Sequence, residues 1–107
     1  MEQQLDQVFF ALSDPTRRAI LGSLAREAAT VGALAEPFDI SAPAISRHMR
    51  VLEKAGLIER ARMGREHHCR LNVSALKGAE DWIQYHREFW ESRLDNLEEL
   101  LRNQDLE

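Results

Sequence analysis

Basic and imidazole side chains crowd into one short stretch, SAPAISRHMRVLEKAGL, which spans residues 41–57. Arg47, His48, Arg50 and Lys54 lie within eight positions of one another. Guanidinium and ammonium groups bind phosphate oxygens, and arginine also pairs with the edge of guanine in the major groove of DNA. The chemistry that this stretch suggests is therefore the binding of a polyanion.

The charge of the whole chain does not suggest such a partner, because its 107 residues carry a formal net charge of −4. The positive charge is concentrated in residues 41–73, where seven basic residues oppose three acidic ones and the net charge is +4. Residues 1–40 and 74–107 have net charges of −3 and −5. A basic segment between two acidic ones is typical of a local phosphate-binding surface.

The helical rotation of residues 41–55 separates an apolar side from a basic one. At about 100° per residue, Met49 and Leu52 fall within about 40° of Ile45, which predicts a buried stripe. Small residues near the start of this helix would let its backbone approach DNA closely, and its free N–H groups can bind a phosphate. The opposite side of the helix carries Pro43, Arg47, Arg50 and Lys54.

The residues that must position this helix begin with capping signals. Asp14 and Pro15 predict the start of a helix that runs to about residue 25 and buries Ala19, Ile20 and Leu24. An amphipathic first helix precedes it over residues 1–12, with a three- and four-residue apolar spacing. The chain contains no repeat or linker, so we expect a single domain over residues 1–107.

Two more capping residues predict the helix-turn-helix itself. Thr30 can cap a short helix and Ser41 can cap the next one, which ends at Ala55 with Gly56 as its left-handed stop. Residues 30–55 are therefore expected to form a helix-turn-helix, with the recognition helix at 41–55.

A β-hairpin is predicted over residues 57–73, because the apolar period changes there from helical to two and Gly64 suits the turn. Cys69, Leu71 and Val73 are expected to share one face. Its basic tip, residues 60–68, can reach the minor groove or the phosphate backbone beside the recognition helix. The alternative for these charges is an exposed sheet edge that is protected against aggregation.

A long final helix over residues 74–101 carries more aromatic surface than a small domain can cover. We expect it to form the interface of a symmetric homodimer together with the first helix, although burial within the protomer's own core is an alternative. The expected fold is thus mostly α with a small β-hairpin, a winged helix-turn-helix with N- and C-terminal dimerisation helices. The predicted dimerisation residues are Val8, Phe9, Trp82, Ile83, Phe89, Trp90, Leu94 and Leu97.

Other chemistries find little support in the sequence. Cys69 is the only cysteine, so no internal disulfide can form, and we interpret it as a small core residue rather than a redox sensor. His67, His68 and Cys69 are adjacent, and strand alternation would send neighbours to opposite faces, so no metal site is expected. No cofactor, enzymatic activity or membrane segment is predicted, and the expected location is the cytoplasm.

The order of these elements resembles the ArsR family of winged helix-turn-helix repressors over nearly the whole chain. LSDPTRRAIL at 12–21 and ISRHMRVLEKAGLIERARMGRE at 45–66 carry the resemblance, together with Leu71. The metal-sensing members' cysteines are missing from VGALAEPF at 31–38, and residues 74–107 lack the second histidine of a paired site. The resemblance implies a homodimeric repressor on an inverted repeat of double-stranded DNA. Because the metal-sensing motifs are missing, we hypothesise that DNA binding does not depend on a metal. An unidentified small-molecule effector is left open.

The resemblance also assigns roles to single residues. Ser46, Arg47, His48 and Arg50 match the DNA-reading segment, and Arg62, Gly64 and Arg65 match the wing. Arg17 matches an arginine that we interpret chiefly as structural, with a phosphate contact as the alternative. His48 lies about 60° from the buried stripe, so bracing of the helix is the alternative to DNA contact. A winged helix that binds only protein is the rival function. The residues expected to contact DNA are Ser41, Ala44, Ser46, Arg47, His48, Arg50, Lys54, Arg62, Arg65 and His67.

Overall fold

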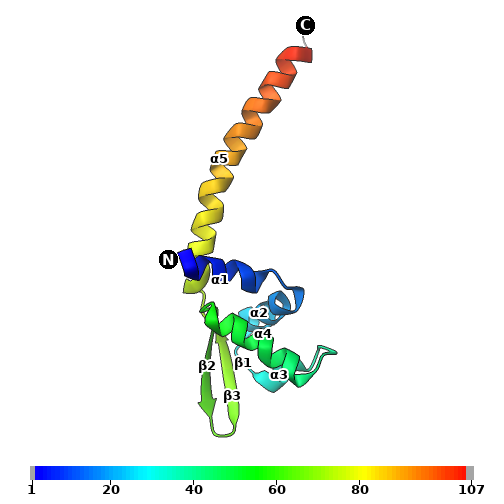
Figure 1. Ribbon diagram of the computed structural model, residues 1–107, viewed down its shortest axis with the longest axis vertical. Coiled ribbons are helices and arrows are strands. Elements are labelled where there is room, and N and C mark those ends of the chain that lie inside the picture. Colours follow the sequence, from blue (N-terminus) through cyan, green and yellow to red (C-terminus); the bar gives the residue numbers. More distant parts are fainter. Residues whose placement is uncertain (1, 106–107) are drawn as a thin grey trace.

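The computed structural model describes residues 2–105, so residue 1 of the predicted 1–12 helix and residues 106–107 lie outside the described part. The molecule has a compact body from which one long helix extends (Figure 1). Its principal extents are 73, 31 and 23 Å. The elements in chain order are α1 (Glu2–Leu12), α2 (Pro15–Arg26), β1 (Ala29–Thr30), α3 (Val31–Ala35), α4 (Ala42–Lys54), β2 (Ile58–Met63), β3 (Glu66–Leu71) and α5 (Ser74–Asp105).

The predicted helix caps are present. The Asp14 carboxylate accepts the backbone N–H of Arg17 at 3.0 Å, which satisfies one of the free donors at the start of α2. Thr30 accepts from Ala33 at 3.1 Å in the same way at the start of α3. The three predicted helix starts in the body are therefore confirmed, because Ser41 also caps α4.

The core lies where α1, α2 and α4 meet the sheet. Val8, Ile20, Met49 and Leu52 are each at most 1% exposed and fill this space. The prediction that Ala19 is buried was wrong, because Ala19 is exposed while Leu21, two positions along α2, is buried instead.

The hairpin is part of a three-stranded antiparallel sheet with strand order β1-β3-β2. The strand β1, in which Ala29 pairs with Cys69, was not predicted. A strand of two residues is too short to show the alternation that identifies strands. The prediction for Val73 was also wrong: β3 ends at Leu71, and Val73 is 66% exposed in the connection to α5.

The connection between α4 and the hairpin is tightly held. Gly56 has a φ of 78°, the left-handed conformation predicted for it, and its carbonyl accepts from the side-chain amide of Asn72 at 3.0 Å. The backbone N–H of Asn72 also donates to Leu57 at 2.8 Å. These bonds fix the direction in which the wing leaves the recognition helix.

The long helix α5 contains 32 residues and packs on α1 only near its start, where Ala79 is 3% exposed. Beyond that point it projects away from the body, on the side opposite the hairpin (Figure 1). Within residues 2–105, no helix is both long and apolar enough to cross a lipid bilayer.

Candidate nucleic-acid interface

The recognition helix α4 presents the two faces that its sequence predicts. Ile45, Met49 and Leu52 are buried, with exposed fractions of 3, 0 and 0%. Arg47, Arg50 and Lys54 on the other side are exposed. Packing of this buried stripe therefore holds the basic side of α4 outward as a continuous ridge.

The N-terminal end of α4 offers little steric hindrance. The Ser41 hydroxyl caps the helix by accepting the Ala44 backbone N–H at 3.3 Å. Pro43 lies in the first turn, and Ser46 is exposed one turn later. Because all four residues are small, another molecule can approach this end of the helix closely.

The hairpin, which we call the wing (residues 57–73), carries its basic residues at the tip. Gly64, with a φ of 68°, and Arg65 form the two-residue turn. Arg62 donates from Nε to the Gly64 carbonyl at 3.0 Å and is paired in register with His67. Arg62, Arg65 and His67 are exposed and thus lie together at the far end of the wing.

The acidic residues of the basic segment are each engaged by a neighbour. Glu53 forms an ion pair with Arg60, and Glu59 contacts Arg70 across the strands at 2.6 Å. Glu66 lies 3.3 Å from His68. Within residues 2–105, no ion pair involves the five remaining basic residues of segment 41–73, which are Arg47, Arg50, Lys54, Arg62 and Arg65.

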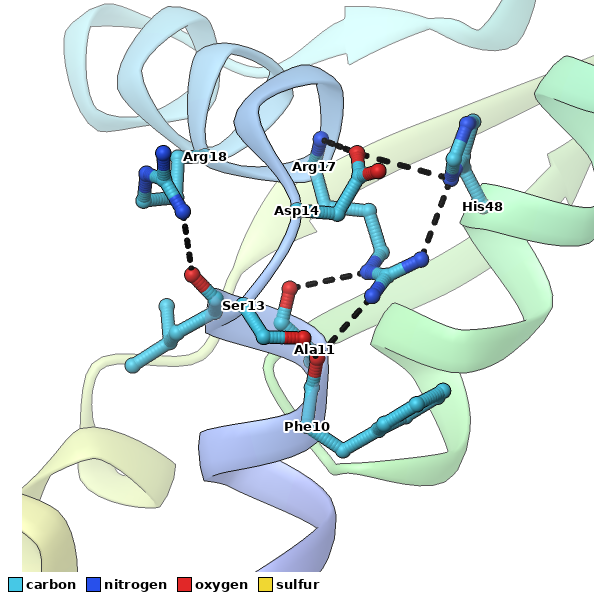
Figure 2. A network of polar contacts seen from close by, with 8 residues as sticks. Phe10, Ala11, Ser13, Asp14, Arg17, Arg18 and His48 are labelled. Atoms are coloured by element: carbon cyan, nitrogen blue, oxygen red, sulfur yellow. Dashed lines mark hydrogen bonds and ion pairs between the residues drawn. The ribbon is translucent and has the colours of Figure 1, made fainter.

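His48 does not belong to the exposed ridge. Its side chain is 20% exposed, and its Nδ1 atom lies 3.2 Å from Nη1 of Arg17 and 3.8 Å from the Asp14 carboxylate (Figure 2). Of the two roles that the sequence leaves open for His48, this geometry corresponds to bracing of the helix. Arg17 is 8% exposed, so its interpretation as a structural residue is confirmed.

Two residues for which the sequence predicts no role at this surface have a part in the arrangement. Asp14 is expected only to cap α2, yet its carboxylate also faces His48. Hydrogen bonding from the Arg17 backbone N–H is the main cause that lowers the pKa of Asp14 below its ordinary value of 3.8. Glu53 ties α4 to the wing. No sequence signal identifies either contact, because the partners belong to different elements.

The apolar side chains of α5 are left uncovered by the protomer. Trp82, Ile83, Phe89 and Trp90 are between 46 and 60% exposed, so burial in the protomer's own core, the alternative for these residues, is excluded. Leu94, Leu97, Leu100 and Leu101 continue this surface, with exposed fractions of 50 to 59%. We call these eight residues the apolar stripe.

The two predicted dimerisation residues of α1 differ from each other. Phe9 is half-buried and meets Trp82 edge to face, with ring centroids 5.6 Å apart. Val8 is 1% exposed and belongs to the protomer's core. The assignment of Val8 to the dimer interface is therefore corrected, because it has no surface to offer a partner.

Cys69 is 1% exposed on the inner face of β3, as expected for a core residue. Burial raises the pKa of its thiol above the ordinary value. In the part of the chain that the structure describes, no three histidine, cysteine or acidic side chains gather as metal ligands would.

Comparison with known proteins identifies relatives in sequence and in fold. A helix-turn-helix domain family matches residues 12–61. The transcriptional repressor SdpR of Bacillus subtilis is 40% identical over 79 residues, which cover 74% of this chain and 88% of SdpR. The crystal structure of an ArsR family transcriptional regulator is 41% identical with a TM-score of 0.80, and the match covers 86% of this chain and 95% of that one.

A more distant structure has the same fold. The homodimeric winged helix-turn-helix DNA-binding domain of a Mycobacterium bovis protein, solved in solution, gives a TM-score of 0.64 at 24% identity, with 84% of each chain covered. The family and the fold are those of DNA-binding transcriptional regulators rather than enzymes. These relatives show, in agreement with the exposed basic ridge and the wing, that this chain belongs to the ArsR family of winged helix-turn-helix transcriptional regulators.

Proposed function

We propose that this protein is a homodimeric transcriptional repressor that binds an inverted-repeat operator in double-stranded DNA. The observation that carries the proposal is the set of five exposed cations on α4 and the wing, Arg47, Arg50, Lys54, Arg62 and Arg65, for which the described residues provide no ion pair. Surfaces that bind other proteins usually contain fewer lysines than the rest of the protein surface, and they do not require a concentrated positive charge.

The proposed contacts are of two kinds: some recognise bases, and others position the protein on the phosphate backbone. An α-helix fits the major groove, where Arg47 and Arg50 are assigned to base edges or phosphates. Lys54, at the C-terminal end of α4, is assigned to a phosphate. Ser41, Ala44 and Ser46 allow the helix N-terminus to come close to the DNA backbone. Arg62, Arg65 and His67 at the tip of the wing are assigned to the minor groove or backbone.

The proposed dimer rests on the apolar stripe of α5 and on Phe9. A contiguous apolar surface of this kind marks an interaction site, and a two-fold dimer buries the same surface from both subunits. The Mycobacterium bovis domain of the same fold is homodimeric, and SdpR is a repressor. Two recognition helices at a fixed distance would read half-sites about 34 Å apart, one turn of DNA.

The test begins with selection of duplexes from a random pool by the purified protein. Fluorescence anisotropy then compares the selected duplex with a scrambled one over a salt series. We expect an inverted repeat, clear preference for the selected duplex, and a steep salt dependence. If all five cations of both subunits met phosphates, the slope of log K against log salt would approach about −9.

Two results would contradict the proposal. Selection of a single half-site by a monomeric protein would contradict both the dimer and the inverted-repeat operator. Absence of binding to any duplex at low salt would leave the basic ridge as a protein contact or a solvated surface, and the rival function would then be favoured.

A further inference from the structure

Arg17 joins three elements of the body at one buried position. Its Nε atom donates to the Ala11 carbonyl at 2.8 Å and its Nη2 atom donates to the Phe10 carbonyl at 2.9 Å. These carbonyls belong to the last turn of α1, where the helix itself supplies no donors. Arg17 thus attaches the end of α1 to the first turn of α2 (Figure 2).

The remaining side of the guanidinium faces the recognition helix. Nη1 of Arg17 lies 3.2 Å from Nδ1 of His48, and a guanidinium has only donors. Nδ1 must therefore be the acceptor, which requires a neutral imidazole with its proton on Nε2. This hydrogen bond crosses from α2 to the middle of α4 and braces α4 on the flank of its buried stripe.

Protonation of His48 is incompatible with this bond. Within residues 2–105, the charged groups within 4 Å of the imidazole are Arg17 of α2 and Asp14, the N-cap of α2. From α1 come the two carbonyls that accept from Arg17 and the Phe10 ring, whose centroid lies 5.0 Å from the guanidinium carbon. An imidazolium has no acceptor and would repel the guanidinium. Its new Nδ1–H would instead be attracted to the Asp14 carboxylate, which at 3.8 Å is beyond hydrogen-bond distance. The ring would have to move to complete that bond, and α4 would lose its hydrogen bond to Arg17.

We propose that His48 is a positioning residue for DNA recognition: neutral His48, held by Arg17, sets the angle of the recognition helix, and protonated His48 releases it. The proposal rests on the proposed function. Base contacts depend on the angle of α4, because hydrogen bonds to base edges are directional. Non-specific binding depends on charge alone and is much less sensitive to that angle. Acidification should therefore reduce the preference for the operator over random DNA.

Two variants distinguish the hydrogen-bond acceptor at position 48 from the protonation of its side chain. His48→Asn places an amide oxygen close to the position of Nδ1, so it can accept from Arg17 but cannot be protonated. His48→Leu is of similar size and has no acceptor. Each protein is titrated with the duplex that the wild-type protein selects and with a scrambled duplex, at about pH 7.5 and about pH 5.5, a range over which imidazole groups change charge. His67, His68 and His86 remain in every protein, so any contribution from them is common to all.

At the higher pH, His48→Asn should bind the selected duplex within about threefold of wild type, whereas His48→Leu should lose about tenfold, because α4 is no longer held by Arg17. Both should bind the scrambled duplex like wild type. On acidification, the ratio of the two affinities should fall about fivefold for wild type and stay nearly constant for His48→Asn. Urea unfolding at both pH values verifies that each variant is folded.

An unchanged affinity of His48→Leu, or the same pH dependence in wild type and His48→Asn, would overturn the proposal. A measurement without DNA tests the contact itself, because nitrogen chemical shifts of the His48 ring distinguish its tautomers. We expect an unprotonated Nδ1 at about pH 7.5, and the opposite tautomer would exclude the bond to Arg17. If no duplex is selected at all, the proposed function fails, and the tautomer still decides whether the bond exists.

Discussion

Arg60 in β2 forms an ion pair with Glu53 in the last turn of the recognition helix. The two side chains are 28 and 32% exposed, so water screens the pair only partly. In register, Arg60 is opposite Cys69, on the inner face of the wing. Arg60 therefore connects the wing to α4, and the charge available for DNA on the wing is that of Arg62 and Arg65.

The first prediction separates these two kinds of arginine. Arg60→Met should lower the free energy of unfolding by about 1 to 2 kcal/mol, because Glu53 loses its partner, and should hardly change the salt slope of DNA binding. Arg65→Ala should leave the free energy of unfolding nearly unchanged. The salt slope of its DNA binding should be smaller by about 1 for each phosphate that is no longer neutralised. Urea titrations and anisotropy salt series measure the two quantities. Equal slope changes for both variants would contradict this separation.

The second prediction concerns the ridge of α4. Arg47→Ala should weaken binding to the selected duplex by about 1 to 3 kcal/mol and affect the scrambled duplex much less, because it removes hydrogen bonds to a base edge. Lys54→Ala should weaken binding to both duplexes similarly and flatten the salt dependence. Anisotropy on the two duplexes distinguishes these outcomes. If both variants lost the same affinity for both duplexes, base recognition and phosphate contact would not be divided between Arg47 and Lys54.

Local signals explain why much of the fold is predictable. Ser41 as a cap, Gly56 as a left-handed stop and the buried stripe of α4 depend on neighbours in sequence, and each is found where expected. The strand β1 depends on a partner about 40 residues away, so its two residues carry no local signal. The exposed position of Ala19 shows a similar limit, because an alanine is accepted on either face of a helix.

The candidate site shows the same division between local and distant information. The exposure of Arg47 and Arg50 follows from the rotation of one helix. The role of Arg17 does not, since its contact with His48 joins residues 31 positions apart. Rotation alone placed His48 between the buried stripe and the ridge, and only the packing of α2 against α4 distinguishes a brace from a DNA contact.

The third prediction follows from the lowered pKa of Asp14, which results mainly from the Arg17 backbone N–H. A carboxylate with a depressed pKa in the folded state stabilises the protein above its unfolded pKa, and this stability is lost as pH falls through the folded pKa. Asp14→Ala should therefore be less stable than wild type by about 1 kcal/mol near pH 7, with a difference that shrinks well below pH 3.8.

Urea unfolding at constant protein concentration measures this difference, since dimer formation makes stability depend on concentration. Asp14→Asn is the matched control, because it keeps the cap but cannot ionise, and its loss near neutral pH should be smaller. A stability difference between wild type and Asp14→Ala that stayed constant down to strongly acidic pH would show that ionised Asp14 contributes nothing.

The fourth prediction concerns the thiol of Cys69. Because it is 1% exposed and burial raises its pKa, it should react with a disulfide reagent about 100-fold more slowly in the folded protein than in urea, at a rate limited by opening of the sheet. Ser92→Cys places a thiol on an exposed part of α5 and should react quickly in the same protein. Rapid reaction of Cys69 in the wild-type protein would make a redox role credible again.

The last prediction tests the apolar stripe. Leu97→Glu inserts a charge into the proposed interface, where desolvation of a carboxylate without a partner is costly, so the dimer should weaken by about 100-fold or more. Ser92→Glu adds the same charge at about 140° from Leu97, outside the apolar stripe although about 60° from Phe89, and should weaken the dimer far less. Analytical ultracentrifugation over a concentration series compares the two variants with wild type.

The variant should also separate dimerisation from DNA contact, because the ridge of α4 lies in the body and not on the distal part of α5. Monomeric Leu97→Glu is expected to bind the inverted repeat much more weakly than wild type, and to bind a single half-site nearly as well per recognition helix. A Leu97→Glu protein that remained dimeric would mean that this part of the stripe is covered in another way, and one that lost half-site binding as well would mean that α5 supports the fold of the body.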